Sequence, residues 1–321
     1  MRAPDFWNRD DVLSRLAAGA LAPLGQLYGA SVAWKSRHTP SFRPPVPVVC
    51  VGNITAGGSG KTPVAIAVGR ALIARGRHPF FLTRGYGGEE RGPVRVEGQS
   101  AEAVGDEPLL LARIAPTVVS RNRREGARFA VECGADVIVM DDGHQNFTLA
   151  KDVSIVVVDG ETSFGNGRVL PAGPLREPAR QGLNRAGAVI VMGDGSPALK
   201  GYAGPVLRAR LEPVSGDLAG RRVLAFAGIG RPAKFFETLK SIGAEIVSIQ
   251  AFPDHHRFTA FEIGRLKKQA RDQNAQLVTT EKDYVRLPEA ARAEVAALPV
   301  EAILSPPGGL ERLLDSLPLP R

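Results

Sequence analysis

Cysteine and aromatic residues are scarce in this sequence of 321 residues, which contains two cysteines and 6% aromatic residues. Cys50 and Cys133 lie in apolar stretches, so we expect reduced, buried thiols in a cytosolic protein rather than a disulfide. Neither has the spacing of a metal ligand. The chain also lacks an aromatic RNA-binding signature, which argues against nucleic acid as a partner. A formal net charge of +8 still favours anionic partners, among which charge alone does not choose.

Charge is missing from residues 16–34, "LAAGALAPLGQLYGASVAW", which lie between Arg15 and Lys35. Glycine, proline and polar residues dilute this stretch, so it is a poor spanning helix although it has the length. Trp7 and Trp34 flank it together with basic residues, which favours a helix at the interface of an anionic membrane. A terminal helix packed on the protein's own core explains the pattern equally well. The nucleotide motif that follows argues against a cleaved secretory signal.

Short apolar runs alternate with helical patterns after the proline-rich stretch 40–47, which predicts an α/β fold. Because the runs are continuous rather than alternating, we expect a mostly parallel sheet with helices on both faces. The expected strands are 48–51, 80–83, 117–120, 137–140 and 154–158, with helices over 63–75 and 122–133.

Three segments are expected along the chain. Residues 1–40 would hold the N-terminal interfacial helix, 41–215 the main domain, and 216–321 a smaller C-terminal α/β domain. This division rests on residues 204–220, which look like a linker, and on the second αβ pattern that follows them.

Residues 55–62, "TAGGSGKT", follow the first expected strand and precede a helix, the context of a P-loop in an NTPase-like domain. The strict pattern has glycine where Thr55 stands. The backbone amides of 57–61 can cradle phosphate oxygens, Lys61 can reach the β and γ phosphates, and the Thr62 hydroxyl can bind Mg²⁺. The predicted nucleotide-binding residues are Thr55, Ala56, Gly57, Gly58, Ser59, Gly60, Lys61 and Thr62.

Further candidates follow neighbouring strands, whose carboxyl ends share one edge of a parallel sheet. Asp141 and Asp142 follow the run 137–140, where carboxylates can hold a metal directly or through water. An ordinary polar strand end is the alternative. Arg84 follows the run 80–83 and suits phosphate or substrate, although a solvated loop arginine is equally compatible.

Two other features have structural explanations of their own. Asp106, in "GDEP", precedes an apolar helix, and its pattern favours a helix N-cap. His255 and His256 stand before Thr259 and Glu262, which match a capping box. Adjacent histidines suit proton handling, but such a loop pair is more often structural.

Taken together, nine strings in order resemble the tetraacyldisaccharide 4'-kinase family of lipid A biosynthesis. They are "GNITAGGSGKTP", "TRGYGG", "GDEP", "DDGHQN", "DVSIVVVDG", "FGNGRVLPAGPLREP", "FAGIGRPAKFF", "FPDHH" and "TTEKD". The resemblance runs from the N-terminal helix to about residue 287. In that family a P-loop without its first glycine is usual, so Thr55 is not an objection.

The resemblance implies transfer of the γ-phosphate of ATP, with Mg²⁺, to the 4'-hydroxyl of a tetraacylated glucosamine disaccharide 1-phosphate. The implied location is the cytoplasmic face of the inner membrane, peripheral or monotopic on its anionic surface. An acylated glucosamine disaccharide 1-phosphate is thus the implied partner, with no nucleic acid and no obligate protein partner.

The resemblance also implies roles, and these replace the cap interpretation of Asp106. Asp106 would be the catalytic base, paired with His255, while Lys61 binds the transferring phosphate. The remaining implied residues are Thr62, Asp141 and Asp142 for the metal, and Arg84, Arg176 and Glu177 near substrate or nucleotide. One string departs from the family, which usually reads DDG, an apolar residue, Gln, His. Here those last positions are His144, Gln145 and Asn146, so the role of the later histidine does not carry over.

Two alternatives remain at this stage. A membrane-associated P-loop ATPase of the partitioning type would hydrolyse ATP without an acceptor, whereas a GTPase is disfavoured because no N-K-x-D motif is present. A non-catalytic membrane or nucleic-acid binding module would bind in a salt-sensitive way without consuming ATP.

Overall fold

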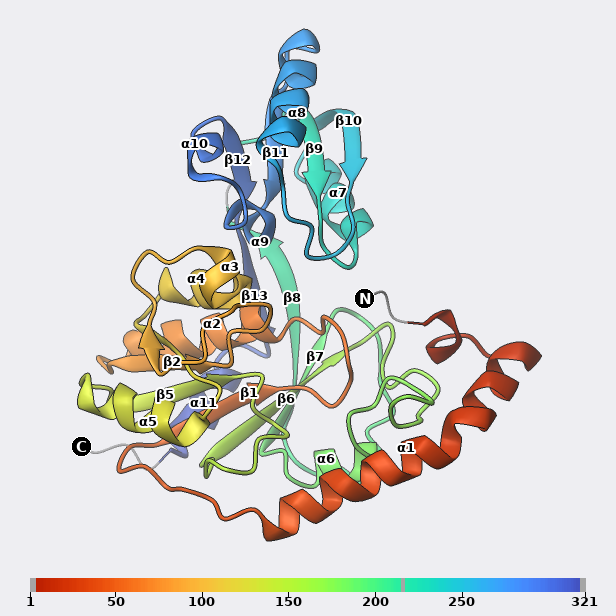
Figure 1. Cartoon of the computed structure of the whole chain (residues 1–321), viewed down its shortest axis with the longest axis vertical. Coiled ribbons are helices and arrows are strands. Elements are labelled where there is room, and N and C mark those ends of the chain that lie inside the picture. Colours follow the sequence, from red (N-terminus) through yellow and green to blue (C-terminus); the bar gives the residue numbers. More distant parts are fainter. Residues whose placement is uncertain (1–3, 215–216, 318–321) are drawn as a thin grey trace.

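Continuous apolar runs form the central strands of a mostly parallel nine-stranded sheet, as the sequence predicts (Figure 1). The computed structural model describes residues 4–214 and 217–317. The strand order is β13-β8-β7-β6-β1-β5-β2-β4-β3, with antiparallel pairing of β13 with β8 and of β3 with β4. The strands are β1 (Val48–Gly52), β2 (Pro79–Thr83), β3 (Val94–Arg95), β4 (Thr117–Val119), β5 (Val137–Asp141), β6 (Val153–Asp159), β7 (Ala188–Met192), β8 (Val206–Pro213) and β13 (Val300–Ser305).

Helices cover both faces of this sheet. Successive side chains of a strand point to opposite faces, so a continuously apolar strand needs a helix on each face to bury them. Val49 of β1 packs with helix α2 (Lys61–Ile73), whereas the next residue, Cys50, packs with helix α5 (Arg123–Glu132). Every residue of β1, β5 and β6 is buried, which explains why their sequences are continuously apolar. The other elements of this lobe are η1 (Asp5–Trp7), α1 (Val12–His38), α3 (Ala101–Val104), α4 (Asp106–Ala112), α6 (Ala179–Leu183) and α11 (Gly309–Asp315).

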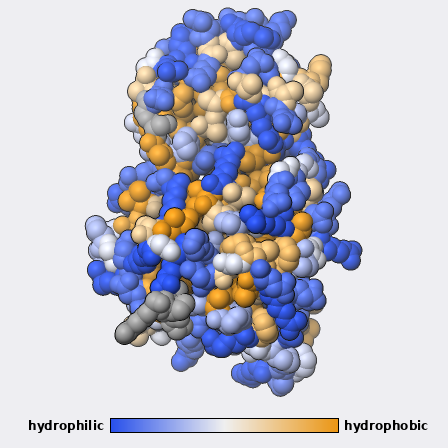
Figure 2. Space-filling model, turned by 90° about the vertical axis from the view of Figure 1, so that its left-hand side faces the viewer, coloured by the Kyte–Doolittle hydropathy of each residue, from blue (hydrophilic) through white to orange (hydrophobic). Residues whose placement is uncertain are grey.

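A smaller lobe stands above the carboxyl ends of the large sheet (Figure 1). Its four parallel strands have the order β10-β9-β11-β12, and the second αβ pattern of the sequence forms the first three of them. Figure 2 shows that the outer end of this lobe is largely hydrophilic. Its elements are β9 (Arg222–Ala227), α7 (Pro232–Ser241), β10 (Glu245–Ala251), α8 (Ala260–Asp272), β11 (Gln276–Thr280), α9 (Glu281–Tyr284), α10 (Glu289–Arg292) and β12 (Val295–Leu298).

The stretch 204–220 is not simply a linker, because it contains β8 of the large sheet. The linker interpretation failed because β8 buries only Leu207 and Ala209 while arginines occupy its exposed positions. The chain also returns to the large lobe at its end, since β13 pairs with β8. Strand β13 and helix α11 therefore belong to the large lobe, although Val300 also packs against the apolar core of the smaller lobe. The expected boundary between 215 and 216 lies outside the described residues.

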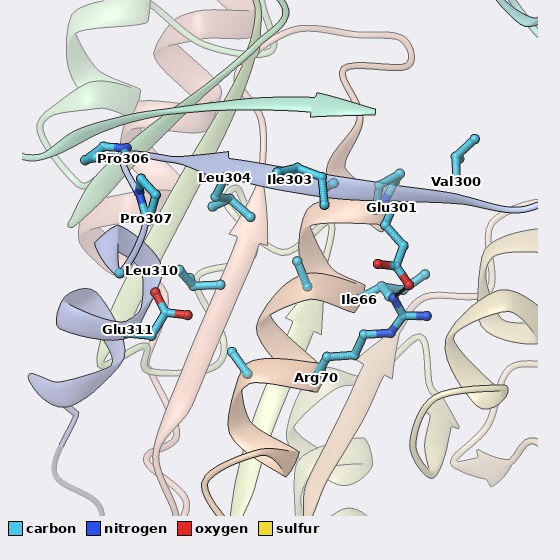
Figure 3. Close-up of a pocket in the computed structure, with 15 residues that line it drawn as sticks. Ile66, Arg70, Val300, Glu301, Ile303, Leu304, Pro306, Pro307, Leu310 and Glu311 are labelled. Atoms are coloured by element: carbon cyan, nitrogen blue, oxygen red, sulfur yellow. Dashed lines mark hydrogen bonds and ion pairs between the residues drawn. The ribbon is translucent and has the colours of Figure 1, made fainter. Parts of the chain in front are cut away.

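A groove of about 450 Å³ lies where β13 and α11 cross helix α2 (Figure 3). Apolar side chains line most of it, and an ion pair between Arg70 and Glu301 spans α2 and β13 there. None of the residues predicted from the sequence to bind nucleotide, metal or substrate lines this groove. The groove therefore belongs to the packing of the returning C-terminal segment.

The two cysteines differ in burial, so the expectation of two buried thiols is wrong for one of them. Cys50 is fully buried in β1, and burial raises the pKa of its thiol. Cys133 is exposed, because it is the C-cap residue at which helix α5 ends.

Helix α1 packs on the large lobe through a narrow stripe of small residues. The structure leaves no room for a side chain at Gly25, where a Cβ atom would approach the carbonyl oxygen of Val169 to 2.7 Å. Most of its large apolar side chains face away from the protein, and only 22% of its most apolar 18-residue stretch is buried. Among the described residues, α1 is the helix that could cross a membrane by length and composition alone, so the glycine, proline and polar residues do not dilute it below that limit. The exposed side chains are Val12, Leu13, Leu16, Leu24, Leu27, Tyr28 and Trp34.

The two tryptophans that flank this helix differ in environment. Trp34 is 61% exposed and stacks on His38. Trp7 is half-buried, and its indole N–H donates to the carbonyl of Pro171 at 3.1 Å. Only Trp34 therefore has the exposed position expected for a headgroup anchor.

Candidate active site

The P-loop motif forms the expected turn between β1 and α2. Gly60 is the N-cap residue of α2 and has a left-handed backbone (φ 82°), while Gly57 also has positive φ (110°). Residues that carry a side chain rarely adopt these backbone conformations, which explains glycine at both positions. Helix α2 then begins at Lys61, so its unpaired N-terminal amides and positive dipole end lie at this turn. Such a site suits phosphate oxygens.

The start of the motif explains why glycine is dispensable at Thr55. Thr55 forms an antiparallel bridge with Leu175, and the amide of Ala56 donates to the carbonyl of Pro174 at 2.7 Å. Extended backbone of this kind accepts any residue, so no glycine is needed. The amide of Ala56 is already paired, which leaves the later residues of the motif to meet a phosphate.

Asp141 ends strand β5 beside the P-loop, as expected. The Thr62 hydroxyl donates to its Oδ2 at 3.2 Å, while its buried Oδ1 has no hydrogen-bond partner within the described part of the chain. Burial, followed by the negative charge of Asp142, raises the pKa of Asp141 to about 7. A buried carboxylate with an unpaired oxygen beside a threonine hydroxyl fits an oxygen-preferring divalent cation.

Asp142 links the P-loop to the loop that carries Arg176. Arg176 donates to both of its carboxylate oxygens, at 2.8 and 3.3 Å, and Lys61 lies 3.9 Å from Oδ1. Burial acts to raise the pKa of Asp142, but the charges of Lys61 and Arg176 outweigh it and lower the pKa. Asp142 also has positive φ (53°), a strained backbone for a residue other than glycine.

Glu177 does not face this site, although it follows Arg176 directly. It is fully buried and accepts two short hydrogen bonds from Arg185, at 2.7 and 2.6 Å. Gln145 donates to the same carboxylate and to the carbonyl of Asn53. Glu177 thus supports the backbone next to the P-loop instead of touching a ligand directly.

Arg84 lies exposed after strand β2. Burial lowers the pKa of the nearby Arg123 to about 10, the negative charges of Asp141 and Asp142 oppose this shift, and the charge of Arg84 adds slightly to it. Arg123 is 4% exposed and its Nε has no partner among the described residues. Arg123 therefore lies near both aspartates at this edge of the sheet, and Arg84 lies near Arg123.

Asp106 is not a helix cap, because Gly105 is the N-cap residue of α4. The cap interpretation failed because the Asp106 side chain is engaged with the other lobe. The Nδ1–H of His255 donates to Oδ2 of Asp106 at 2.9 Å, and Arg286 donates to the same oxygen at 2.6 Å. Burial alone would raise the pKa of Asp106, but these two hydrogen bonds and the charge of Arg286 lower it to about 2.

His255 reaches Asp106 from a loop of the small lobe between β10 and α8. Its backbone has positive φ (59°), and its amide donates to the carbonyl of Gly228 at 3.1 Å. The expected capping box of Thr259 and Glu262 starts α8 directly after this loop. His256 is turned away and pairs with Glu262 at 3.1 Å, so only His255 of the two meets Asp106.

The residues around the P-loop lie next to the pair formed by Asp106 and His255. Glu107, next to Asp106, is close enough to Asp141 for its charge to raise the pKa of that carboxyl. Lys282 of the small lobe pairs with Glu107 at 2.7 Å. A phosphate-binding turn, a buried carboxylate with an open oxygen, and a histidine–aspartate pair thus share one edge where the lobes meet.

This arrangement and the motif order agree with comparisons to known proteins. A family model described as tetraacyldisaccharide-1-P 4'-kinase matches residues 17–318. The chain belongs to this family. It is 53% identical to the tetraacyldisaccharide 4'-kinase of Paramagnetospirillum magneticum, over 99% of each chain. It is 50% identical to that of Rhodospirillum rubrum, over 100% of this chain and 99% of the relative.

A solved structure supports the same tetraacyldisaccharide-1-P 4'-kinase fold. The enzyme from Aquifex aeolicus, described as an "apo" form in complex with ATP, superimposes with a TM-score of 0.76 at 27% identity. The match covers 93% of this chain and 98% of that one. Family membership disfavours the partitioning-ATPase alternative.

His144, where this 4'-kinase family member departs from the usual string, is a structural residue. It is 1% exposed, its Nε2 lies 3.0 Å from the carbonyl of Gly182, and its Nδ1 lies 2.9 Å from the hydroxyl of Ser154. A carbonyl only accepts, so Nε2 carries the proton. Burial and nearby cations lower the pKa of His144 to about 3, which keeps the ring neutral.

Sequence reasoning missed Arg286, the second partner of Asp106 in this family member. It lies 180 positions away from Asp106, shortly after the "TTEKD" string. No spacing rule connects residues so far apart, and an arginine after a short helix is usually solvated. Only the packing of the two lobes identifies it.

Proposed function

We propose that this protein transfers the γ-phosphate of ATP to the 4'-hydroxyl of a tetraacyldisaccharide 1-phosphate, giving the 1,4'-bisphosphate. The observation that carries the proposal is the Asp106 carboxylate, held through Oδ2 by His255 beside a P-loop. Its Oδ1 accepts no hydrogen bond from the described residues, so it is open to an acceptor hydroxyl. This geometry supports Asp106 as the base that would take the proton of that hydroxyl.

The remaining residues of the site suit phosphoryl transfer, which depends mainly on positioning and charge stabilisation. The P-loop amides and Lys61 would hold the phosphates of ATP. Thr62 and Asp141 would bind Mg²⁺, which supplies positive charge to the transferring phosphoryl group when bound. Arg176, held by Asp142 beside Lys61, would contact phosphate or the sugar from the opposite loop.

A direct assay tests the proposal. The full-length protein is incubated with γ-labelled ATP, Mg²⁺ and the lipid disaccharide 1-phosphate in mixed micelles, and we expect label on the sugar. Release of labelled phosphate without labelled lipid would instead support an acceptor-independent ATPase. ATP binding without either product would support a non-catalytic module.

The exposed face of α1 suggests that the enzyme meets its acceptor at an anionic inner-membrane surface, on the cytoplasmic side. Apolar side chains of an interfacial helix enter the headgroup region, where basic residues attract anionic lipid. Trp34 and the cations Lys35 and Arg37 lie together at the C-terminal end of α1.

Changing two leucines of this face tests the membrane proposal. The double substitution Leu16→Glu with Leu27→Glu should weaken co-sedimentation with phosphatidylglycerol vesicles by at least about tenfold. The reason is that the favourable free energy of moving each leucine side chain from water into the membrane is lost. Binding of ATP to the soluble protein should not change. Phe261→Glu, an 81% exposed site on α8, is the matched control and should leave vesicle binding unaltered. Equal vesicle binding by the double variant and the parent would contradict the proposal.

A further inference from the structure

Arg286 is a buried cation that joins the two lobes at the proposed catalytic carboxylate. Its side chain is 4% exposed, and its Nη2 donates to Oδ2 of Asp106 at 2.6 Å. Its Nη1 donates at 2.9 Å to Oδ1 of Asp283 and to the carbonyl of Gly228. One guanidinium thus contacts the large lobe on one side and two groups of the small lobe on the other.

The small-lobe partners of Arg286 are themselves fixed. Asp283 is fully buried, and its Oδ2 accepts from the amide of Gly228 at 2.9 Å and from the hydroxyl of Thr280 at 2.8 Å. Gly228 is closely packed, because a Cβ atom there would lie 3.1 Å from that of His256 and 3.2 Å from Oδ1 of Asp283, so its neighbours would have to shift slightly. The guanidinium is therefore anchored to a rigid support.

Arg286 and His255 make parallel connections between the same two groups. Both donate to Oδ2 of Asp106, and the Gly228 carbonyl accepts from the His255 amide and from Arg286. The Arg286 Nη2 lies 3.4 Å from Nδ1 of His255. The two side chains therefore share the Asp106 carboxylate and the Gly228 carbonyl as partners.

The other described ion pairs between the lobes are more exposed. Arg231 pairs with Asp159 at 2.9 Å and is 37% exposed, while Lys282 pairs with Glu107 and is 28% exposed. Exposed pairs contribute little, whereas breaking a buried pair leaves an uncompensated charge. Arg286 is thus the connection whose loss disturbs the junction most.

We propose that Arg286 is a positioning residue of the phosphoryl transfer: it turns the Asp106 carboxylate so that Oδ1 faces the acceptor hydroxyl, and it docks the loop that carries His255. The inference rests on the proposed role of Asp106 as the base. It adds a residue that acts through Asp106 and touches neither ATP nor the lipid.

The charge around Asp106 gives this role a measurable signature. Burial raises the pKa of Asp106, and its hydrogen bonds to His255 and Arg286 with the Arg286 charge lower it. Without Arg286 the pKa should rise. Because the base must be ionised, activity is lost as the pH falls through that pKa. The acid limb of the plot of activity against pH should therefore move to higher pH. The charged or titratable groups near Asp106 are Glu102, Glu107, His255, Lys282 and Arg286.

The test compares Arg286→Gln with the parent protein in the lipid phosphorylation assay. We expect kcat to fall by about 10- to 100-fold, less than the full contribution of a general base, with the KM for ATP unchanged. The midpoint of the acid limb should rise by about one to three pH units, the usual effect of losing an opposite charge. Direct titration of ¹³C-labelled aspartate carboxyls, with Asp106 assigned by its loss in Asp106→Asn, should show the same rise without depending on activity.

Two further variants keep the test decisive. Arg286→Lys keeps the charge but lacks the planar fork, so its acid limb should stay near that of the parent while kcat is intermediate. Arg292→Gln is the matched control, because Arg292 binds the carbonyls of Val285 and Leu287 in the same segment without touching Asp106. An unshifted Asp106 titration in Arg286→Gln, or an equal loss of kcat in Arg292→Gln, would overturn the proposal. Failure of the parent to label lipid would reject the proposed function instead, while the carboxyl titration still reports on Arg286.

Discussion

Asp106→Asn is expected to lower the rate of lipid phosphorylation by about 10²- to 10⁴-fold, the usual contribution of a general base. An amide keeps the size of the side chain but cannot take the proton of the sugar hydroxyl. Binding of ATP should persist, because the contacts of Asp106 are with His255 and Arg286 and not with the P-loop. Single-turnover transfer from labelled ATP and equilibrium ATP binding measure the two properties separately.

Glu102→Gln provides the matched control for this substitution. Glu102 is an exposed carboxylate close enough to Asp106 for the two charges to interact, but no hydrogen bond joins it to His255 or Arg286. Its removal should leave the rate close to that of the parent. Undiminished transfer by Asp106→Asn would assign the base to another residue. Loss of ATP binding in that variant would show that Asp106 acts on the structure of the site instead.

Local sequence predicted the centre of the fold because the central strands bury both faces. In β1, β5 and β6 every residue is buried, so these strands are short, almost continuously apolar runs. The same rule failed for β8, which lies beside the antiparallel β13 and has arginines on its exposed face. A half-exposed strand near the sheet edge carries too few apolar residues to separate it from a loop.

The site was predictable where it depends on one stretch of chain or on the rule for strand ends. The turn at Gly60 and the position of Asp141 beside Thr62 follow from that rule. Contact between Asp106 and His255, 149 positions apart, follows from no local pattern, and only the family resemblance suggested it. Residue physics alone favoured a cap for Asp106, because nothing nearby in sequence reveals a partner contributed by the other lobe.

Glu177 and Arg286 illustrate how little a local string says about where a side chain packs. Glu177 lies in a string tied to the family, yet it is fully buried against Arg185 and supports the backbone next to the P-loop. Arg286 has no distinctive local string, yet it contacts the proposed base. Sequence motifs locate the backbone of a site, whereas the side chains that meet there depend on packing between lobes.

Asp141→Asn is expected to change activity and stability in opposite directions. Loss of a carboxylate from the proposed Mg²⁺ site should lower kcat by at least about 10²-fold, because several kcal/mol of charge stabilisation at the transition state are lost. In the metal-free protein, however, the ionised carboxylate of Asp141 destabilises the folded state. Its pKa is raised from about 3.8 when unfolded to about 7 when folded, so the folded state binds more protons between these values. Stability of the parent therefore falls as the pH rises through that window.

Chemical denaturation with EDTA at pH 5 and pH 8 measures this stability effect. The asparagine variant should gain on the order of 1–4 kcal/mol over the parent at pH 8, and less at pH 5, where Asp141 is largely protonated. Asp142→Asn is the control of opposite sign. The pKa of Asp142 is lowered by Lys61 and Arg176 despite burial, so its charge stabilises the fold at pH 8 and its removal should destabilise the protein. Equal loss of stability in both variants would show that Asp141 is a satisfied structural carboxylate and would remove its assignment to the metal.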